Sequence, residues 1–149
     1  MDVASFIAID GPVGSGKTTV GRLLAARLGH TFLDTGVMYR AVTYLALQKN
    51  VSLNDAPALT KLASTTEMEL VPDSGEECRV IVDSGDLTDR LRSPEVDRAV
   101  SAVSAVPGVR EVLVRLQREV AIRGQIVMVG RDIGTVVLTG AGLKIYLDA

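Results

Sequence analysis

Residues 11–18, Gly-Pro-Val-Gly-Ser-Gly-Lys-Thr, match the pattern G-x-x-x-x-G-K-[ST] of a phosphate-binding P-loop. The apolar run Phe6–Ile9 precedes them and predicts a strand, and a helical pattern follows from near Gly16 to about Leu28. The glycines allow a tight turn whose backbone N–H groups point at phosphate oxygens, and the helix adds the positive end of its dipole. This order of elements predicts the binding of a nucleoside triphosphate.

Two side chains of the loop carry specific expectations. Lys17 is expected to reach the β- and γ-phosphates and to act in catalysis, and the Thr18 hydroxyl is expected to ligate Mg²⁺. The expected ATP-binding residues are Gly11, Pro12, Val13, Gly14, Ser15, Gly16, Lys17, Thr18 and Thr19.

The composition indicates a folded domain and disfavours some partners. The chain has 149 residues, 47% of them hydrophobic, with a net charge of −2 and 3% aromatic residues, which argues against nucleic acid and anionic membranes as partners. Cys78 is the only cysteine, so an intrachain disulfide is excluded and a cytoplasmic location is expected. We expect Cys78 to be a packing residue, and the single histidine, His30, to cap a helix or lie at the surface.

The rest of the pattern alternates strands with helices and predicts an α/β fold whose sheet is mostly parallel. Strands are expected near residues 3–9, 31–33, 67–71, 79–83, 125–129 and 143–147. One helix is expected over about 16–28, and a second contains Met38 and ends at about residue 49. Three more helices are expected to begin at residue 54 or 55, at residue 93 and at residue 107. Two polar turns, at 72–75 and 83–86, indicate a small β insertion.

In the first helix, one apolar face is predicted to contain Val20, Leu23, Leu24 and Leu28.

The carboxyl ends of parallel strands are where ligands bind in such sheets, and three motif-bearing loops are expected there. These are the P-loop, residues 34–40 and residues 130–134. Arginines that suit phosphate binding occur at loop and helix-start positions, namely Arg40, Arg92, Arg110 and Arg131. The chain lacks the Asn-Lys-x-Asp of a GTPase, and no acidic pair of the kind found in ATPase motors follows a strand.

Several stretches together resemble the bacterial cytidylate (CMP/dCMP) kinase family in order and spacing. They are 9–12 (IDGP), 33–40 (LDTGVMYR), 92–96 (RSPEV), 100–110 (VSAVSAVPGVR) and 130–137 (GRDIGTVV). The resemblance covers nearly the whole chain. It implies the three-layer P-loop NTPase fold as a single kinase domain over 1–149, with a monophosphate-binding insertion at about 50–92. It also implies phosphoryl transfer from ATP to CMP or dCMP in pyrimidine nucleotide metabolism.

The resemblance also implies roles for acceptor-binding residues. Arg40 and Arg131 would hold the phosphate of CMP, with Thr35 hydrogen-bonding nearby, and Arg131 would also be catalytic. Ser101, Arg110 and Asp132 would read cytosine, which offers a donor at N4 and acceptors at N3 and O2. Without the resemblance, Ser101 reads as a surface serine and Asp132 as a loop cap.

The chain differs from the family in three places. Val37 replaces an alanine, residues 139–142 replace a Pro-Asp-Ala turn, and the family continues beyond Ala149 with an arginine-bearing lid and an Asp/Arg pair. A chain that ends there is expected to be incomplete at its C-terminus. Two alternatives therefore stay open: a non-catalytic or weakly active nucleotide-binding fragment, and a P-loop kinase of another small metabolite. We expect a monomer for the full-length family and allow self-association for a fragment.

Overall fold

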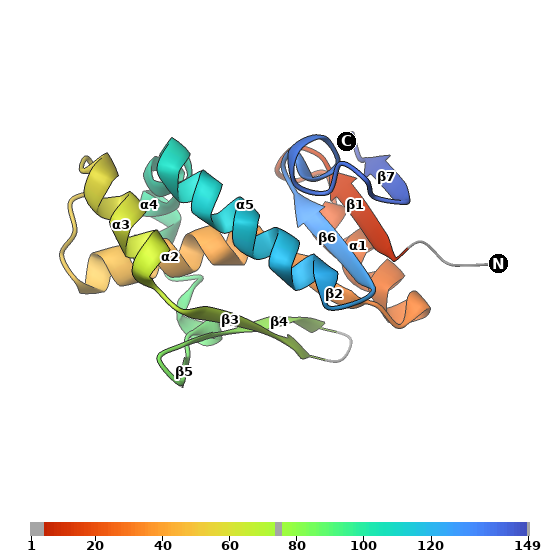
Figure 1. The fold of residues 1–149 in the computed structure, drawn as a ribbon, viewed down its shortest axis with the longest axis horizontal. Coiled ribbons are helices and arrows are strands. Elements are labelled where there is room, and N and C mark those ends of the chain that lie inside the picture. Colours follow the sequence, from red (N-terminus) through yellow and green to blue (C-terminus); the bar gives the residue numbers. More distant parts are fainter. Residues whose placement is uncertain (1–4, 74–75, 149) are drawn as a thin grey trace. The chain divides into compact units, whose positions relative to one another are not determined.

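The chain folds into two compact units, each assembled from segments that lie far apart in the sequence (Figure 1). The computed structural model describes residues 5–73 and 76–148. Of these, unit 1 comprises residues 5–35, 72–73, 76–78 and 117–148, and unit 2 comprises residues 36–71 and 79–116.

Unit 1 is an α/β layer built on parallel strands. Its elements are β1 (Phe6–Asp10), α1 (Lys17–Leu28), β2 (Thr31–Asp34), β6 (Ile126–Gly130), the π-helical turn η2 (Ile133–Val137) and β7 (Leu143–Tyr146). The strands lie in the order β2-β6-β1-β7, and each neighbouring pair is parallel. The α/β class with a mostly parallel sheet is therefore confirmed. Residues 3 and 4, at the start of the first expected strand, lie outside the described part of the chain.

The core of unit 1 forms where α1 packs against the sheet. Its buried residues are Ile7, Ile9, Ala25, Phe32, Val127 and Val129, with Leu24 and Leu28 partly buried against them. Every residue of β6 is buried, as expected of a central parallel strand, whose sequence reads as a continuous apolar run.

The apolar face predicted for α1 is partly wrong. Val20 and Leu23 are 41% and 58% exposed, and the fully buried positions of the helix are Gly21 and Ala25. A Cβ built on Gly21 would lie 2.6 Å from Val129 Cγ1 and 2.9 Å from Phe32 Cε1. The helix therefore approaches the sheet too closely for large side chains, and small residues mark the contact.

Unit 2 is mainly helical. Its elements are α2 (Gly36–Gln48), α3 (Ala56–Thr65), β5 (Gly85–Asp86), η1 (Thr88–Arg90) and α4 (Pro94–Ser104). Three further elements contribute residues to both units: β3 (Met68–Asp73), β4 (Glu76–Val82) and α5 (Pro107–Ile122). Helix α2 packs against α4 and α3.

The helix starts predicted in unit 2 are confirmed by their caps. Asp55 Oδ1 accepts a hydrogen bond from the Ala58 N–H at 3.0 Å, and Ser93 Oγ accepts one from the Val96 N–H at 3.2 Å. Each cap satisfies an N–H group that the first helical turn leaves without a partner.

The β insertion is confirmed as a small antiparallel element. Strands β4 and β5 pair through Val82 and Gly85, and the two residues between them, Asp83 and Ser84, have φ values of 51° and 65°. Positive φ at both central positions matches the twist of a two-residue hairpin. Hydrogen bonds from Thr88, helped by Arg79, hold the pKa of Asp86 below its usual value. In the 72–75 turn, residues 74 and 75 lie outside the described residues.

Two single residues complete unit 1. Cys78 is buried as expected, with its Sγ donating to the Phe32 carbonyl at 3.2 Å. His30 is buried rather than at the surface, and its Nδ1 lies 3.2 Å from the Leu28 carbonyl oxygen at the end of α1. In the described part of the chain, no helix combines the length and apolar character needed to cross a membrane.

Candidate nucleotide-binding site

The P-loop connects β1 to α1 through two left-handed glycines. Gly14 and Gly16 have φ values of 81° and 87°, a region that side chains with a Cβ rarely adopt. Gly16 is the N-cap of α1, and no side chain of the described residues caps this helix end, so the N–H groups of its first turn are available to an anion. The loop is thus shaped for phosphate.

Lys17 folds back over its own loop. Its Nζ donates to the carbonyl oxygens of Gly11 at 2.8 Å and Pro12 at 3.2 Å. An ammonium group has three donors and no acceptor, so phosphate oxygens can replace these carbonyls one for one. The lysine is therefore held at the loop in an orientation from which it can exchange partners.

Ser15 supplies an independent sign that the loop accepts a polar ligand. Its Oγ is buried, and among the described residues it is the only buried side-chain nitrogen or oxygen that lacks a hydrogen-bond partner. Buried polar groups nearly always have a hydrogen-bond partner, so we expect the Ser15 hydroxyl to bind one when a ligand is present. A phosphate oxygen in the loop would provide one.

Asp34 is a candidate residue that sequence reasoning missed. It ends β2, and its Oδ2 accepts a hydrogen bond from Thr18 Oγ1 at 2.9 Å. A hydroxyl and a carboxylate beside a P-loop are the oxygen ligands that Mg²⁺ prefers. The available signal was an acidic residue at the end of a strand, but its partner becomes visible only when α1 and β2 lie together.

The carboxyl ends of β1, β2 and β6 lie side by side. Asp10 is paired with Gly130, and Asp34 with Val129. The buried Thr35 follows β2, and its Oγ1 donates to the Val129 carbonyl at 3.1 Å. Within unit 1, the P-loop, Thr35 and the loop after β6 therefore begin at one edge of the sheet.

The loop after β6 carries Arg131 and Asp132, and both side chains are exposed. Asp132 has a φ of 58°, a left-handed conformation that aspartate tolerates better than most residues. The expected loop over 130–134 is corrected here, because a π-helical turn, η2, begins at Ile133. π-turns are rare and occur often at functional sites.

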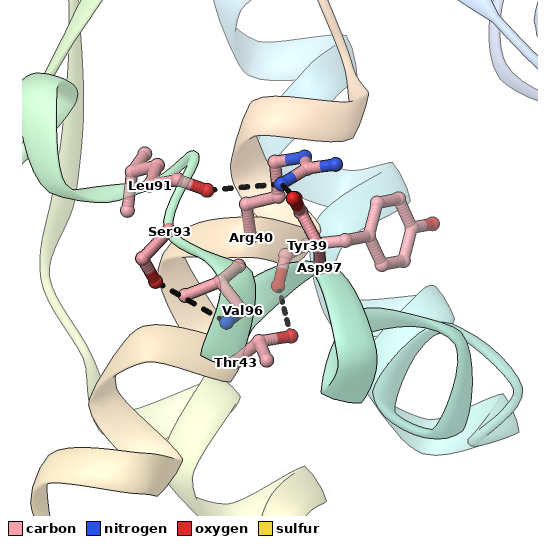
Figure 2. Close-up of polar contacts among 7 residues, drawn as sticks. All are labelled: Tyr39, Arg40, Thr43, Leu91, Ser93, Val96 and Asp97. Carbon is pink, nitrogen blue, oxygen red and sulfur yellow. Dashed lines mark hydrogen bonds and ion pairs between the residues drawn. The ribbon is translucent and has the colours of Figure 1, made fainter.

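In unit 2, Arg40 lies in the second turn of α2, so residues 36–40 of the expected 34–40 loop are helical (Figure 2). Its Nη1 donates to the Leu91 carbonyl at 3.0 Å and pairs with Asp97 Oδ1 at 2.6 Å. Both bonds use one nitrogen, and a guanidinium group has five N–H donors. Arg40 is thus oriented by α4 and the segment before it, with donor capacity beyond these bonds.

The other candidates of unit 2 are exposed. Ser101 lies on α4, Arg110 lies in the first turn of α5, and Arg92 lies between η1 and α4. Their exposure leaves them accessible to a ligand. The structure describes them in unit 2 and the P-loop in unit 1.

The fold and the loop define a P-loop NTPase of the kinase type with a small antiparallel insertion. A sequence model of the family described as cytidylate kinase matches residues 7–149. The chain belongs to the cytidylate kinase family.

Individual relatives agree with this assignment. The chain is 54% identical to a cytidylate kinase of Pelotomaculum thermopropionicum, with 96% of this chain and 63% of the relative aligned. It is 51% identical to one of Herpetosiphon aurantiacus, covering 96% of this chain and 64% of the relative. A bifunctional pantoate ligase/cytidylate kinase of a Synechococcus strain is 52% identical over 96% of this chain and 27% of its own length. The chain thus spans just under two thirds of the first two relatives.

Proposed function

We propose that this chain, as part of a kinase domain, transfers the γ-phosphoryl group of ATP to CMP or dCMP, giving ADP and CDP or dCDP. The observation that carries the proposal is the pairing of Asp10 with Gly130. It brings the start of the P-loop beside the start of the Arg131–Asp132 loop, in a chain of the cytidylate kinase family. A donor loop and an arginine-bearing loop at one sheet edge suit transfer between two phosphorylated substrates.

On the donor side, Lys17 would leave the Gly11 and Pro12 carbonyls for the β- and γ-phosphate oxygens. Ser15 Oγ and the N–H groups at the start of α1 would donate to the same phosphates. The proposed ATP-binding residues are those of the P-loop, 11–19. The left-handed Gly14 and Gly16 support this role, because they allow the backbone to wrap closely around the phosphates.

Thr18 and Asp34 would hold a Mg²⁺ ion, since their oxygens already lie 2.9 Å apart. When bound, this ion neutralises charge on the β- and γ-phosphates. Asp34 extends the metal site that the sequence alone assigned to Thr18.

On the acceptor side, we propose that Arg40, Arg131 and Thr35 bind the phosphate of CMP. Ser101, Arg110 and Asp132 would read the base. A carboxylate at Asp132 accepts from cytosine N4, whereas uracil presents an acceptor there and would be rejected.

The chemistry needs no general base. The phosphate oxygen of CMP that attacks the γ-phosphorus in line is already largely ionised at neutral pH. Catalysis then rests on positioning and charge neutralisation, to which Lys17 and Arg131 contribute. Arginines at such transition states are worth about 10³–10⁵ in rate.

The same proposal sets the wider context. Residues 50–92 would form the monophosphate-binding insertion of one kinase domain over 1–149. The protein would act as a monomer in pyrimidine nucleotide metabolism in the cytoplasm, a setting that a lone buried cysteine fits.

A coupled assay of ADP release tests the proposal. With ATP and Mg²⁺, we expect CMP and dCMP to stimulate ADP release well above UMP and AMP. Lys17→Ala should lower the CMP-dependent rate at least about a hundredfold. Lys49→Ala, which removes an exposed lysine just after α2, is the matched control and should leave the rate unchanged.

Two results would overturn the proposal. Absence of stimulation by any nucleotide would favour a P-loop kinase of another metabolite. Binding of an ATP analogue without CMP-dependent turnover would favour a non-catalytic nucleotide-binding chain.

A further inference from the structure

The π-helical turn η2 is held by a carboxylate at its amino end. Asp10 Oδ1 accepts from the Ile133 N–H at 2.6 Å, and Asp10 Oδ2 accepts from the Gly134 N–H at 2.9 Å. Both oxygens of one side chain thus bind successive backbone donors. These bonds lie directly after Asp132, which has a left-handed backbone and whose carbonyl accepts from the Val136 N–H at 2.9 Å.

A side chain of opposite charge holds the other end of the turn. Arg118, on α5, donates from Nε to the Val137 carbonyl at 3.0 Å and from Nη2 to the Val136 carbonyl at 2.6 Å. A carboxylate on N–H groups and a guanidinium on carbonyls both match the dipole of a helical turn. The backbone from 133 to 137 is therefore fixed at both ends.

Asp10 is also firmly placed itself. As the last residue of β1, it is paired with Gly130 on β6 and with Tyr146 on β7. Its backbone carbonyl accepts from the Leu147 N–H at 2.8 Å. The next residue is Gly11, the first of the P-loop. Asp10 therefore joins the P-loop to the Arg131–Asp132 loop through its backbone and its side chain.

We propose that Asp10 is a positioning residue, which sets the Arg131–Asp132 loop relative to the P-loop without touching either substrate. Arg118 is its counterpart at the far end of the turn. This role rests on the proposed function, since it acts through Arg131 and Asp132. Loss of the carboxylate should let these two side chains shift, while the P-loop keeps its own glycine-based geometry.

Asp10→Asn is the informative change, because the amide has the same shape but only one acceptor for two N–H donors. We expect kcat/KM for CMP to fall about 10- to 100-fold, with KM for ATP changing by less than about twofold. Hydrogen exchange without ligands should show the Ile133 and Gly134 amides exchanging about tenfold faster. The matched control is Glu119→Gln, which makes the same acid-to-amide change at an exposed position of α5 and should leave the CMP kinetics and these two amides unchanged.

The two readouts separate this inference from the proposed function. If the unmodified chain shows no CMP-dependent transfer, the proposed function fails, while the exchange of the two amides still tests whether Asp10 holds the loop. Unchanged exchange in Asp10→Asn, or an equal rise of KM for ATP and CMP, would overturn the positioning role. If Asp10→Asn does not fold, Arg118→Lys carries the same test, with a smaller effect in the same direction expected on both readouts.

Discussion

Asp132 combines an exposed carboxylate with a left-handed backbone, and both features bear on its proposed reading of cytosine. The φ of 58° lies outside the values of a regular strand or right-handed helix. Aspartate and asparagine adopt this conformation at lower cost than alanine does. A substitution meant to probe base recognition should therefore keep the backbone preference and change only the hydrogen-bonding pattern.

Asp132→Asn meets this requirement. A carboxylate can only accept a hydrogen bond, whereas an amide can accept from cytosine N4 or donate to uracil O4. We expect the ratio of kcat/KM for CMP over UMP to fall by about 5- to 150-fold, in line with about 1–3 kcal/mol for one specific base contact. KM for ATP, measured in the same assay, should stay within about twofold of its unmodified value.

An equal loss of activity with both acceptors would show that Asp132 does not read the base. Asp132→Ala serves as the second comparison. It removes the acceptor and also disfavours the left-handed backbone, so it should lower CMP activity further than Asp132→Asn.

For single residues, the sequence allows a role to be predicted when the residue belongs to a short contiguous motif. Lys17 and Thr18 received predicted roles because their spacing to the P-loop glycines is fixed. Asp10 and Asp34 were not assigned roles, because their partners lie far along the chain: Gly134 for Asp10 and Thr18 for Asp34. Only the parallel register of β1, β2 and β6 brings these pairs together.

At the scale of the element, helix α1 shows why apolar periodicity misjudged a packed face. The helix contacts the sheet through the buried Gly21 and Ala25, with Leu24 and Leu28 partly buried against the same core. Val20 and Leu23, which were predicted on the same face, are exposed. Caps and turns were easier to predict, because Asp55 and Ser93 act on N–H groups within three residues. The π-turn η2 was not predicted, since Asp10 and Arg118, which hold it, come from other elements.

Gly21→Ala tests the close approach of α1 to the sheet. Alanine is the better helix former, so at an exposed site the change would stabilise the helix by up to about 1 kcal/mol. Here the new methyl group would lie 2.6 Å from Val129 Cγ1 and 2.9 Å from Phe32 Cε1. We expect the overpacking to prevail and the free energy of unfolding to fall by about 1–2 kcal/mol in urea denaturation.

Gly140→Ala is the matched control for that change. Apart from its two chain neighbours, no described residue has a heavy atom within 4 Å of a Cβ built at Gly140, so its effect should stay within about 0.5 kcal/mol. A Gly21→Ala chain as stable as the unmodified one would show that α1 does not need a small residue at this contact.

At the scale of the whole molecule, the chain builds each unit from distant segments, and this was not predicted. The 50–92 region predicted as one insertion contributes residues to both units, with 72–73 and 76–78 in unit 1. Local patterns identify strands but carry no information on which strand partners they find. Cys78 illustrates the point, since it belongs to β4 yet bonds to the Phe32 carbonyl of β2.

This buried thiol makes the stability of the folded chain depend on pH in the alkaline range. Burial, with a smaller contribution from Glu77, raises the pKa of Cys78 from 9.0 to about 11. Above pH 9 the unfolded chain loses the thiol proton while the folded chain keeps it, so the folded state binds more protons and stability falls with pH. The stabilisation is fully present below pH 9 and is lost by about pH 11.

Between pH 9 and pH 11, we expect the ionisation of Cys78 to lower the free energy of unfolding by about 2 kcal/mol, since each unit of pKa corresponds to about 1.4 kcal/mol. Urea denaturation under reducing conditions, at intervals from pH 8 to 11, would measure it against Cys78→Val. The valine chain has a constant offset from its altered packing but no thiol to ionise, and lysine and tyrosine titration is common to both chains. The difference between the two free energies of unfolding should therefore change only above pH 9, where the cysteine chain loses stability relative to the valine chain. A difference that stays constant up to pH 11 would show that the thiol ionises as readily in the folded chain as in the unfolded one.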